Sequence, residues 1–399
     1  MKILALTHRL PYAPNRGDRI RSYHLLRLLA TQFEVHLFSL ADAADTIHTD
    51  GLREWLASVH VAVPDRIGNS VRAALGLAGG RPVTHALLDG RNAEKQIAGL
   101  AAAIRPDVTY AYCSGMARFV VDGPLQGLPS VIDMVDVDSA KWRALGATAK
   151  LPLGWVYRRE ARVLRQFESR ASRHVAATLV VNDREREALR EIAPDATIHV
   201  VENGVDLEHF AAPDMAPDSR EVVFCGVMDY VPNIEGAGWF AAAVWPLVRR
   251  SVKDARFTIV GARPSAAVLK LASLPGVAVS GAVEDVRPYL WRAAVSVAPL
   301  LTARGLQNKV LEALAAGLPV VTTPAVQAGL PAAVLDGCHF SDDAGATAEA
   351  VVRLLRASPA DRRRISLRAD LRGLSWQSRL SGVPAILADA ARSSPRKRG

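Results

Sequence analysis

Residues 304–321, with the sequence RGLQNKVLEALAAGLPVV, carry the side chains whose types and spacing most clearly suit chemistry. A loop containing Gly305 leads into a predicted helix that bears Lys309 and Glu312 and stops at Gly317. Backbone N–H groups and a lysine at the start of a helix can face phosphates, and a carboxylate can accept hydrogen bonds from ribose hydroxyls. The pattern therefore suits a nucleotide-sugar diphosphate. An ordinary amphipathic helix packed on a sheet explains the same spacing equally well.

Three aspartates, Asp133, Asp136 and Asp138, follow a short predicted strand at residues 130–132. Carboxylates at Asp-x-Asp spacing are typical ligands of a hard divalent cation. Carboxylates at the end of a strand can equally bind an acceptor hydroxyl or remove its proton. The spacing alone leaves both interpretations open.

The loop after the first predicted strand, PYAPNRGDR at residues 11–19, carries further candidates. Gly17 would let backbone amides approach an anionic ligand closely. Arg16 and Arg19 are candidate contacts to a phosphate or to an acceptor. For Arg19 and its neighbour Arg21, a solvated face on the first turn of the next helix is the alternative.

Two glycine-containing motifs lie further along the chain. Gly226 directly follows an apolar run, and a glycine there permits close approach of a ligand to the backbone. Asn203-Gly204 supports a tight turn with positive φ, and we interpret it as a hinge. Downstream of Gly226, a helix is predicted for residues 236–248.

Apolar runs alternate with helical patterns along the whole chain, which predicts an α/β protein with parallel sheets and helices on both faces. The runs form two series, separated by the polar, proline-rich stretch 211–219. They comprise residues 2–7, 35–38, 59–63, 108–112, 130–132, 178–181 and 197–201, then 221–226, 257–261, 277–279, 295–299 and 320–322. We expect two successive doubly wound, Rossmann-like domains. Ligands then bind in a cleft between them, at the carboxyl ends of the strands.

Length and composition agree with two domains, because 399 residues are ample for two hydrophobic cores. No apolar stretch approaches the ~18 residues that a membrane span needs, and the apolar run at 3–6 is too short for a signal peptide. Cys113, Cys225 and Cys338 are widely separated, with no CxxC motif. This spacing argues against disulfides and thiolate metal sites, so we expect a protein of the reducing cytoplasm.

Most of the net charge of +9 is concentrated in one segment. Residues 140–175 hold nine lysines and arginines against Glu160 and Glu168, which leaves +7. Trp155 and Tyr157 lie in the same segment, and basic residues beside apolar ones suit an anionic membrane surface at about 1 kcal/mol per cation. A solvated helix packed on its own domain is the alternative. Nucleic acid is not an expected partner, because no nucleic-acid-binding motif accompanies the charge.

Taken in order, these motifs resemble a family 4 glycosyltransferase of the GT-B fold. The resemblance covers nearly the whole chain. It rests on Gly17, Asn203-Gly204-Val205-Asp206, Gly226, and Lys309-x-x-Glu312 followed by Ala316-Gly317-x-Pro319. More narrowly, residues 135–142 and 304–312 resemble bacterial sugar transferases associated with exosortase (PEP-CTERM) exopolysaccharide loci.

The resemblance implies roles for individual residues, and one position departs from the family pattern. Glu312 matches the second glutamate of the family's E-x7-E pattern, which implies that it binds the ribose of the donor. The first glutamate falls at position 304, where this chain has Arg304, and a guanidinium can bind diphosphate instead. Many family members also carry a cation just after the glycine that matches Gly226, but this chain has no cation there. Lys309 and Arg304 are therefore expected to supply the phosphate-binding charge.

The implied activity is that of a retaining, hexosyl-type glycosyltransferase. It would use a nucleotide-diphosphate sugar and act on a polyprenyl-diphosphate-linked saccharide at the inner face of the cytoplasmic membrane. The family resemblance implies no metal and no other cofactor. The implied catalytic residues are Asp136, Asp138 and Arg304; the donor-binding residues are Gly226, Gly305, Asn308, Lys309 and Glu312; and the acceptor or phosphate loop contains Arg16, Gly17 and Arg19.

We expect an acceptor-binding domain over residues 1–205 and a donor-binding domain over 206–375. A helix within 376–399 would then return to the first domain before a basic tail. A GT-B nucleotide-sugar epimerase and a non-catalytic nucleotide-sugar-binding protein are the alternatives. An oxidoreductase fits less well, because no GxGxxG motif follows the first strand.

Overall fold

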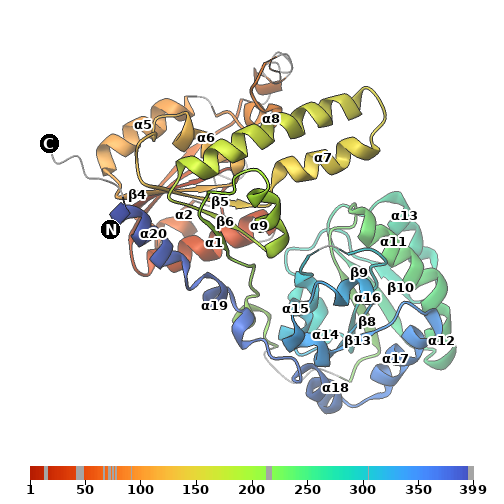
Figure 1. Cartoon of the computed structure of the whole chain (residues 1–399). Coiled ribbons are helices and arrows are strands. Elements are labelled where there is room, and N and C mark those ends of the chain that lie inside the picture. The colour runs from red at the N-terminus through yellow and green to blue at the C-terminus, as the bar shows by residue number, and fades with distance from the viewer. Residues whose placement is uncertain are drawn as a thin grey trace. The chain divides into compact units, whose positions relative to one another are not determined.

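A computed structural model of the chain provides the structure (Figure 1). It describes residues 1–12, 17–41, 49–65, 68–70, 73, 76, 79–90, 92–212, 218–303 and 305–393, with Gly17, Asp18 and Thr148 described by their backbone only. The chain forms two compact units. Unit 1 comprises Met1–Asn203 and Arg379–Gly399, and unit 2 comprises Gly204–Ser378.

Unit 1 contains a seven-stranded parallel sheet with the order β3-β2-β1-β4-β5-β6-β7. Its strands are β1 (Lys2–Thr7), β2 (Glu34–Leu40), β3 (Ser58–Ala62), β4 (Val108–Tyr112), β5 (Ser130–Val135), β6 (Ala177–Val180) and β7 (Ile198–Val200). In β1, every residue from Ile3 to Thr7 is buried, as expected for a parallel strand covered on both faces.

The helices of unit 1 cover both faces of this sheet. They are α1 (Gly17–Ala30), α2 (Asp50–Arg53), α4 (Val83–Leu87), α5 (Ala93–Ile104), α6 (Ser114–Val121), α7 (Asp138–Thr148), α8 (Leu153–His174), α9 (Asp183–Arg190) and α20 (Val383–Ser393). Helices α5, α6 and α8 lie on one face, and α1 and α20 lie on the other (Figure 1). The C-terminal helix α20 packs on β4 and β5 and buries Val383 and Leu387 completely.

Unit 2 contains a six-stranded parallel sheet with the order β10-β9-β8-β11-β12-β13. Its strands are β8 (Glu221–Cys225), β9 (Arg256–Val260), β10 (Val277–Val279), β11 (Val295–Ala298), β12 (Val320–Thr322) and β13 (Cys338–Phe340). Its α-helices are α10 (Leu207–Phe210), α11 (Val231–Trp239), α12 (Trp245–Ser251), α13 (Ala266–Lys270), α14 (Arg287–Arg292), α15 (Asn308–Ala315), α16 (Pro324–Gln327), α17 (Ala344–Arg356) and α18 (Pro359–Ser366). Helix α19 (Trp376–Leu380) spans the point where the chain returns to unit 1.

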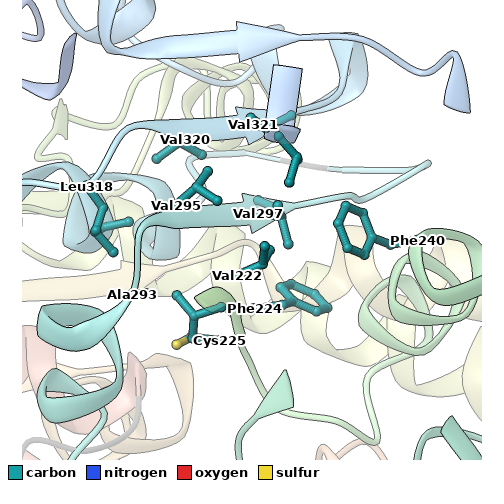
Figure 2. Packing of buried hydrophobic residues seen from close by; sticks show 14 of the residues in the cluster. Val222, Phe224, Cys225, Phe240, Ala293, Val295, Val297, Leu318, Val320 and Val321 are labelled. Carbon is teal, nitrogen blue, oxygen red and sulfur yellow. The ribbon is translucent and has the colours of Figure 1, made fainter. Parts of the chain in front are cut away.

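The core of unit 2 is built from the β-branched and aromatic residues of its central strands. Figure 2 shows Val222 of β8, Val295 of β11 and Val320 of β12 side by side on neighbouring strands, with Phe224 and Phe240 close by. All five side chains are at most 1% exposed. Tight apolar packing therefore fixes the central strands in place up to their carboxyl ends.

The expectation of two parallel-sheet, Rossmann-like domains is confirmed, and each predicted strand has a counterpart. Strand β13 was not predicted, because Cys338-His339-Phe340 is short and only partly apolar. The bounds predicted for the helix at 236–248 were wrong. It starts earlier, at Val231, and a π-helical turn at Phe240–Val244 separates α11 from α12.

The Asn203-Gly204 motif differs from the predicted turn with positive φ. Neither residue has a positive φ. Instead, a Cβ atom at Gly204 would lie 2.5 Å from the backbone nitrogen of Trp376. The next residue, Val205, donates its N–H to Leu374 O at 2.8 Å and accepts from Trp376 N at 3.3 Å. Glycine is required here for close backbone packing within unit 2.

Candidate functional site

The strand order of unit 2 marks a position for ligand binding. The chain runs from β8 outward through β9 to β10, then returns to the other side of β8 with β11. Ligands bind doubly wound sheets at this reversal, beyond the carboxyl ends of the two central strands. Gly226 follows β8, and the connection after β11 leads into α15, which starts at Asn308. Both predicted donor-binding segments therefore converge on the reversal point.

Lys309 is held at this point by a fixed set of contacts. Its ammonium donates to Asn233 Oδ1 at 2.6 Å, and Asn233 Nδ2 in turn donates to Val227 O at 2.8 Å. The ammonium also lies 4.9 Å from the centroid of the Phe224 ring, in cation–π range. Because Phe224 belongs to the packed core, the lysine head group is positioned by the sheet itself.

Gly226 completes the arrangement because no side chain fits there. A Cβ atom at position 226 would lie 2.8 Å from Asn233 Nδ2 and 3.2 Å from Lys309 Nζ. Gly261, at the end of β9, has φ +149°, and a Cβ atom there would lie only 1.7 Å from Gly226 O. The two glycines let the loops after β8 and β9 pack backbone to backbone beside the lysine.

Burial shifts the pKa of each ionisable group in the site in the direction that favours its uncharged form. It lowers the pKa of Lys309 to about 8, although the Cys225 thiol and the Glu312 carboxylate act in the opposite direction. Burial raises the pKa of Glu312 to about 7, and Lys309 limits that rise. Burial also raises the pKa of Cys225 to about 12, so this thiol stays protonated. An anionic ligand would restore the full charge of Lys309 by stabilising its protonated form.

The remaining predicted donor-binding residues border the same helix. Gly305 has φ +63°, a conformation that favours glycine, and Asn308 is the first residue of α15. Helix α15 ends at Ala315, two residues before the predicted stop at Gly317. Gly317 has φ +81° and donates its N–H to Leu314 O, while Leu318 N–H donates to Ala313 O. Arg304 lies outside the described residues.

Two residues of this region were not identified from the sequence as site residues. Asn233, in α11, holds Lys309 across 76 positions of sequence, and nothing local to either residue signals the pairing. Arg263, after β9, pairs with Asp229 in the loop after β8, with 2.7 Å between Nε and Oδ2. A cation therefore reaches this loop from the neighbouring strand, although the loop's own sequence lacks one.

In unit 1, Asp136 and Asp138 lie at the carboxyl end of β5, as predicted. Asp138 accepts a hydrogen bond from Ser114 Oγ at 2.7 Å, and Asp136 is exposed. Loss of hydration raises the pKa of both carboxyls; Glu185 and Asp138 add to the rise for Asp136, whereas the Ser114 hydrogen bond opposes it for Asp138. Within the described part of the chain, no three His, Cys, Asp or Glu side chains gather as a metal site requires.

Asp133 does not belong to this exposed group, and Arg21 is not solvated. Asp133 is fully buried within β5 and accepts from Arg21 Nε at 2.9 Å and from Tyr110 OH at 2.9 Å. Arg21, 1% exposed, also donates to Val201 O at 2.8 Å. Although burial alone would lower it, the Asp133 carboxylate raises the pKa of Arg21 above its ordinary value. Both side chains hold elements of unit 1 together, because Asp133 pairs with Arg21 and Arg21 Nη1 donates to Val201 O inside the unit.

The loop after β1 is only partly described. Arg16 lies outside the described residues, and Gly17 is the first residue of α1. Arg19 is partly buried, with its guanidinium 3.5 Å from Tyr12 O. The predicted contacts of Arg16, Gly17 and Arg19 with a phosphate or acceptor stay predictions.

The basic segment around α7 and α8 is more positive at its surface than its sequence suggests. Both of its carboxylates are buried: Glu160 accepts from the N–H groups of Val83 and Thr84, and Glu168 accepts from Ser139 N at 3.1 Å. Of its nine cations, Arg159 is buried against Glu160, and the others are exposed. In the described residues, no helix combines the length and apolar character needed to cross a bilayer.

Comparison with known proteins assigns a family to part of the chain. Residues 219–357 match the family described as Glycosyl transferases group 1. This range extends from β8 to the end of α17, and so it includes Gly226, Asn233, Lys309 and Glu312. No curated protein matches the sequence.

Solved structures match over the whole chain. Sucrose-phosphate synthase from Thermosynechococcus elongatus has a TM-score of 0.68 at 16% identity, covering 99% of this chain and 100% of its own. Anabaena Alr3699/HepE, solved in complex with UDP, has a TM-score of 0.62 at 13% identity, with 98% and 100% covered. TarM has a TM-score of 0.63 at 9% identity, with 97% and 98% covered. The chain has the GT-B fold, and the family match together with these neighbours supports a GT-B glycosyltransferase.

Proposed function

We propose that this chain is a retaining glycosyltransferase that transfers a hexosyl group from a nucleotide-diphosphate sugar. One observation carries the proposal: Gly226, Asn233 and Lys309 meet at the reversal point of the sheet whose residues match group 1 glycosyltransferases. The UDP bound to the Anabaena protein of the same fold supports a nucleotide donor.

Each group in the site has a task in this reaction. Lys309 and the first N–H groups of α15 would neutralise the departing diphosphate, and Glu312 would accept hydrogen bonds from the ribose. Such a site works mainly by positioning the substrates and by stabilising developing negative charge. Retention without a covalent intermediate then follows from attack on the face that the diphosphate leaves.

Unit 1 would bind the acceptor. A raised pKa makes a carboxylate a stronger base, so Asp136 and Asp138 are candidates to accept a proton from an acceptor hydroxyl. We propose a polyprenyl-diphosphate-linked saccharide as the acceptor, in exopolysaccharide or cell-surface glycan synthesis of the kind that exosortase-associated transferases perform. The exposed cations of α7 and α8 support a peripheral position on the anionic, cytoplasmic face of the membrane. We propose that no metal ion or other cofactor is required.

A donor screen tests the proposal directly. Only a ligand of the folded chain raises its melting temperature, so UDP, GDP and ADP sugars can be compared by thermal shift. The best donor is then incubated with a lipid-linked saccharide and a chelator, and product is analysed for anomeric configuration. Release of an epimerised nucleotide sugar without an acceptor would indicate an epimerase. Binding without turnover of any donor would indicate a non-catalytic binding protein.

Arg304 gives a sharper test of this particular chain. If its guanidinium binds the diphosphate, Arg304→Glu should abolish turnover, because a carboxylate beside the diphosphate is repulsive and the bidentate contacts are lost. The measurement is kcat/KM with the donor from the screen. A variant with unchanged or higher activity would show that position 304 does not contact the phosphates.

A further inference from the structure

A cavity of about 220 Å³ lies within unit 1, between α7, α8 and α9. Its apolar lining comes from small and aliphatic side chains, namely Val137, Ala140, Ala161, Ala188 and Ile192. The other lining residues are Ser139, Glu191 and four arginines. The cavity is therefore an apolar hollow with a strongly basic rim, and it is separate from the lysine site in unit 2.

The four arginines converge on this cavity from two helices. Arg158, Arg162 and Arg165 follow one another at intervals of four and three residues on α8, which places them on one helical face. Arg143 approaches from α7. We call these four residues with their hollow the arginine pocket.

The charges of the arginine pocket are not neutralised by the protein. Arg143, Arg162 and Arg165 make no hydrogen bond or ion pair with any residue that the structure describes, and Arg158 donates only to Gly146 O, at 3.1 Å. Glu191 is the single carboxylate of the lining. Four neighbouring guanidinium groups against one carboxylate repel one another unless an anion is bound. Guanidinium groups pair with phosphate oxygens through two parallel hydrogen bonds, so phosphate is the anion that this arrangement fits best.

An exposed apolar surface lies on the same pair of helices. Leu151, which precedes α8, and Leu153 and Trp155 in its first turn are 75%, 57% and 52% exposed, and Leu145 of α7 is 43% exposed. Arg158 to Arg165 follow Trp155 by three to ten residues, or roughly 5–15 Å along the helix. A ligand that spans both features carries a phosphate head group and an apolar chain.

We propose that the arginine pocket binds the diphosphate of a prenyl-diphosphate lipid, whose chain lies against Leu151, Leu153 and Trp155. This proposal rests on the proposed function, because it places the head group of the lipid-linked acceptor. The apolar hollow accommodates the first part of the chain, and the four arginines contact the diphosphate oxygens. A common phospholipid carries one phosphate charge and would engage fewer of these arginines.

The test is cosedimentation of the full-length protein with phosphatidylcholine vesicles that contain farnesyl diphosphate. Vesicles of equal charge density made with phosphatidylglycerol form the second arm, and inorganic diphosphate is added as a competitor. The variant is Arg162→Ala/Arg165→Ala. The matched control is Arg170→Ala/Arg184→Ala, which removes the same charge from α8 and α9 outside the pocket.

We expect the wild-type protein and the control to bind farnesyl diphosphate vesicles at least tenfold more tightly than the pocket variant does. Binding of phosphatidylglycerol vesicles should differ less than twofold between the two variants. Equal loss in both variants, equal wild-type binding to the two vesicle types, or no wild-type binding would each overturn the proposal. Because the assay contains no donor, its outcome is independent of turnover. A chain that transfers sugar but ignores prenyl diphosphate would contradict this inference alone.

Discussion

Two groups position the ammonium of Lys309, and burial lowers its pKa. The hydrogen bond to Asn233 and the contact with the Phe224 ring fix the ammonium, while burial brings its pKa down to about 8. For Glu312 burial acts in the opposite direction and raises the pKa to about 7. At pH 7 a lysine with a pKa of about 8 keeps most of its charge, whereas a carboxyl with a pKa of about 7 is only about half ionised. Under the proposed function, a diphosphate would favour the charged form of Lys309, and ribose hydroxyls would favour the ionised form of Glu312.

Removing these groups should weaken nucleotide binding. Lys309→Ala deletes the charge, Glu312→Gln removes the carboxylate, and Asn233→Ala releases the lysine. Each loss of a charge-assisted hydrogen bond should cost about 1.5–3 kcal/mol, or roughly 10- to 150-fold in Kd. Isothermal calorimetry with the preferred nucleotide measures the change, and the exposed Lys270→Ala serves as the control. Wild-type affinity in all three variants would remove α15 and α11 from the site.

The same pKa values predict how binding depends on pH. Above about pH 8 the free protein loses the charge of Lys309, and below about pH 7 Glu312 takes up a proton. Affinity for a nucleotide sugar should therefore be highest between these values and should fall on both sides. Calorimetry near pH 8.5 in buffers of different ionisation enthalpy should detect proton uptake. Lys309→Arg stays charged, so its alkaline fall should disappear. A wild-type affinity that is constant from pH 7 to 9.5 would contradict the assignment.

At the scale of elements, a buried ion pair joins the first helix of unit 1 to the middle of its sheet. Arg21 of α1 reaches Asp133 of β5 and the carbonyl of Val201 just after β7, and Tyr110 of β4 shares the same carboxylate. One buried ion pair therefore links α1, β4, β5 and the residue that follows β7.

Breaking this pair should destabilise unit 1. Asp133→Asn leaves the Arg21 guanidinium buried without its counter-charge, which should cost about 3–5 kcal/mol of unfolding free energy. Asp136→Asn, three residues away on an exposed position, should change the free energy by less than about 0.5 kcal/mol. Urea denaturation followed by circular dichroism measures both. Equal midpoints for the two variants would show that the pair contributes little.

Elements were predictable from the sequence where apolar runs were long, and contacts between elements were not. Residues 2–7 and 108–112 are uninterrupted apolar-rich segments, and both are strands with those bounds. Lys309 and Glu312 stood out because their types and spacing suit a phosphate and a ribose. Arg21 looked like a surface residue and Asn233 looked like part of an ordinary helix, because each finds its partner more than 70 positions away. Gly204 was predicted to adopt a positive φ, but close backbone packing is what requires glycine there. The sequence cannot distinguish the two reasons, since both select glycine.

At the scale of the whole molecule, the two units differ in continuity. Unit 2 is one unbroken stretch, Gly204–Ser378, whereas unit 1 is assembled from Met1–Asn203 and the last residues of the chain. Helix α20 supplies Val383, Leu387 and Ala390 to the interior of unit 1. Topologically, unit 2 is therefore an insertion between two parts of unit 1.

This continuity predicts that residues 204–378 form an autonomous domain. The fragment contains the whole six-stranded sheet and every residue of the lysine site. Expressed alone, it should unfold cooperatively and bind the nucleotide with an affinity within about tenfold of the full chain. Calorimetric unfolding and nucleotide titration check this. Residues 1–203 alone should not fold stably, because they lack α20. A disordered 204–378 fragment would show that unit 2 needs unit 1.

The position of α20 also has a consequence for synthesis on the ribosome. Translation delivers β4 and β5 before unit 2 and their covering helix after it, and at ~5–20 residues per second the intervening stretch of unit 2 takes roughly 10–35 s to make. During that interval the nascent first unit exposes the apolar surface that α20 later covers. Unit 1 is thus started before unit 2 and completed after it, and a chain released before residue 383 should be insoluble because its first unit lacks α20.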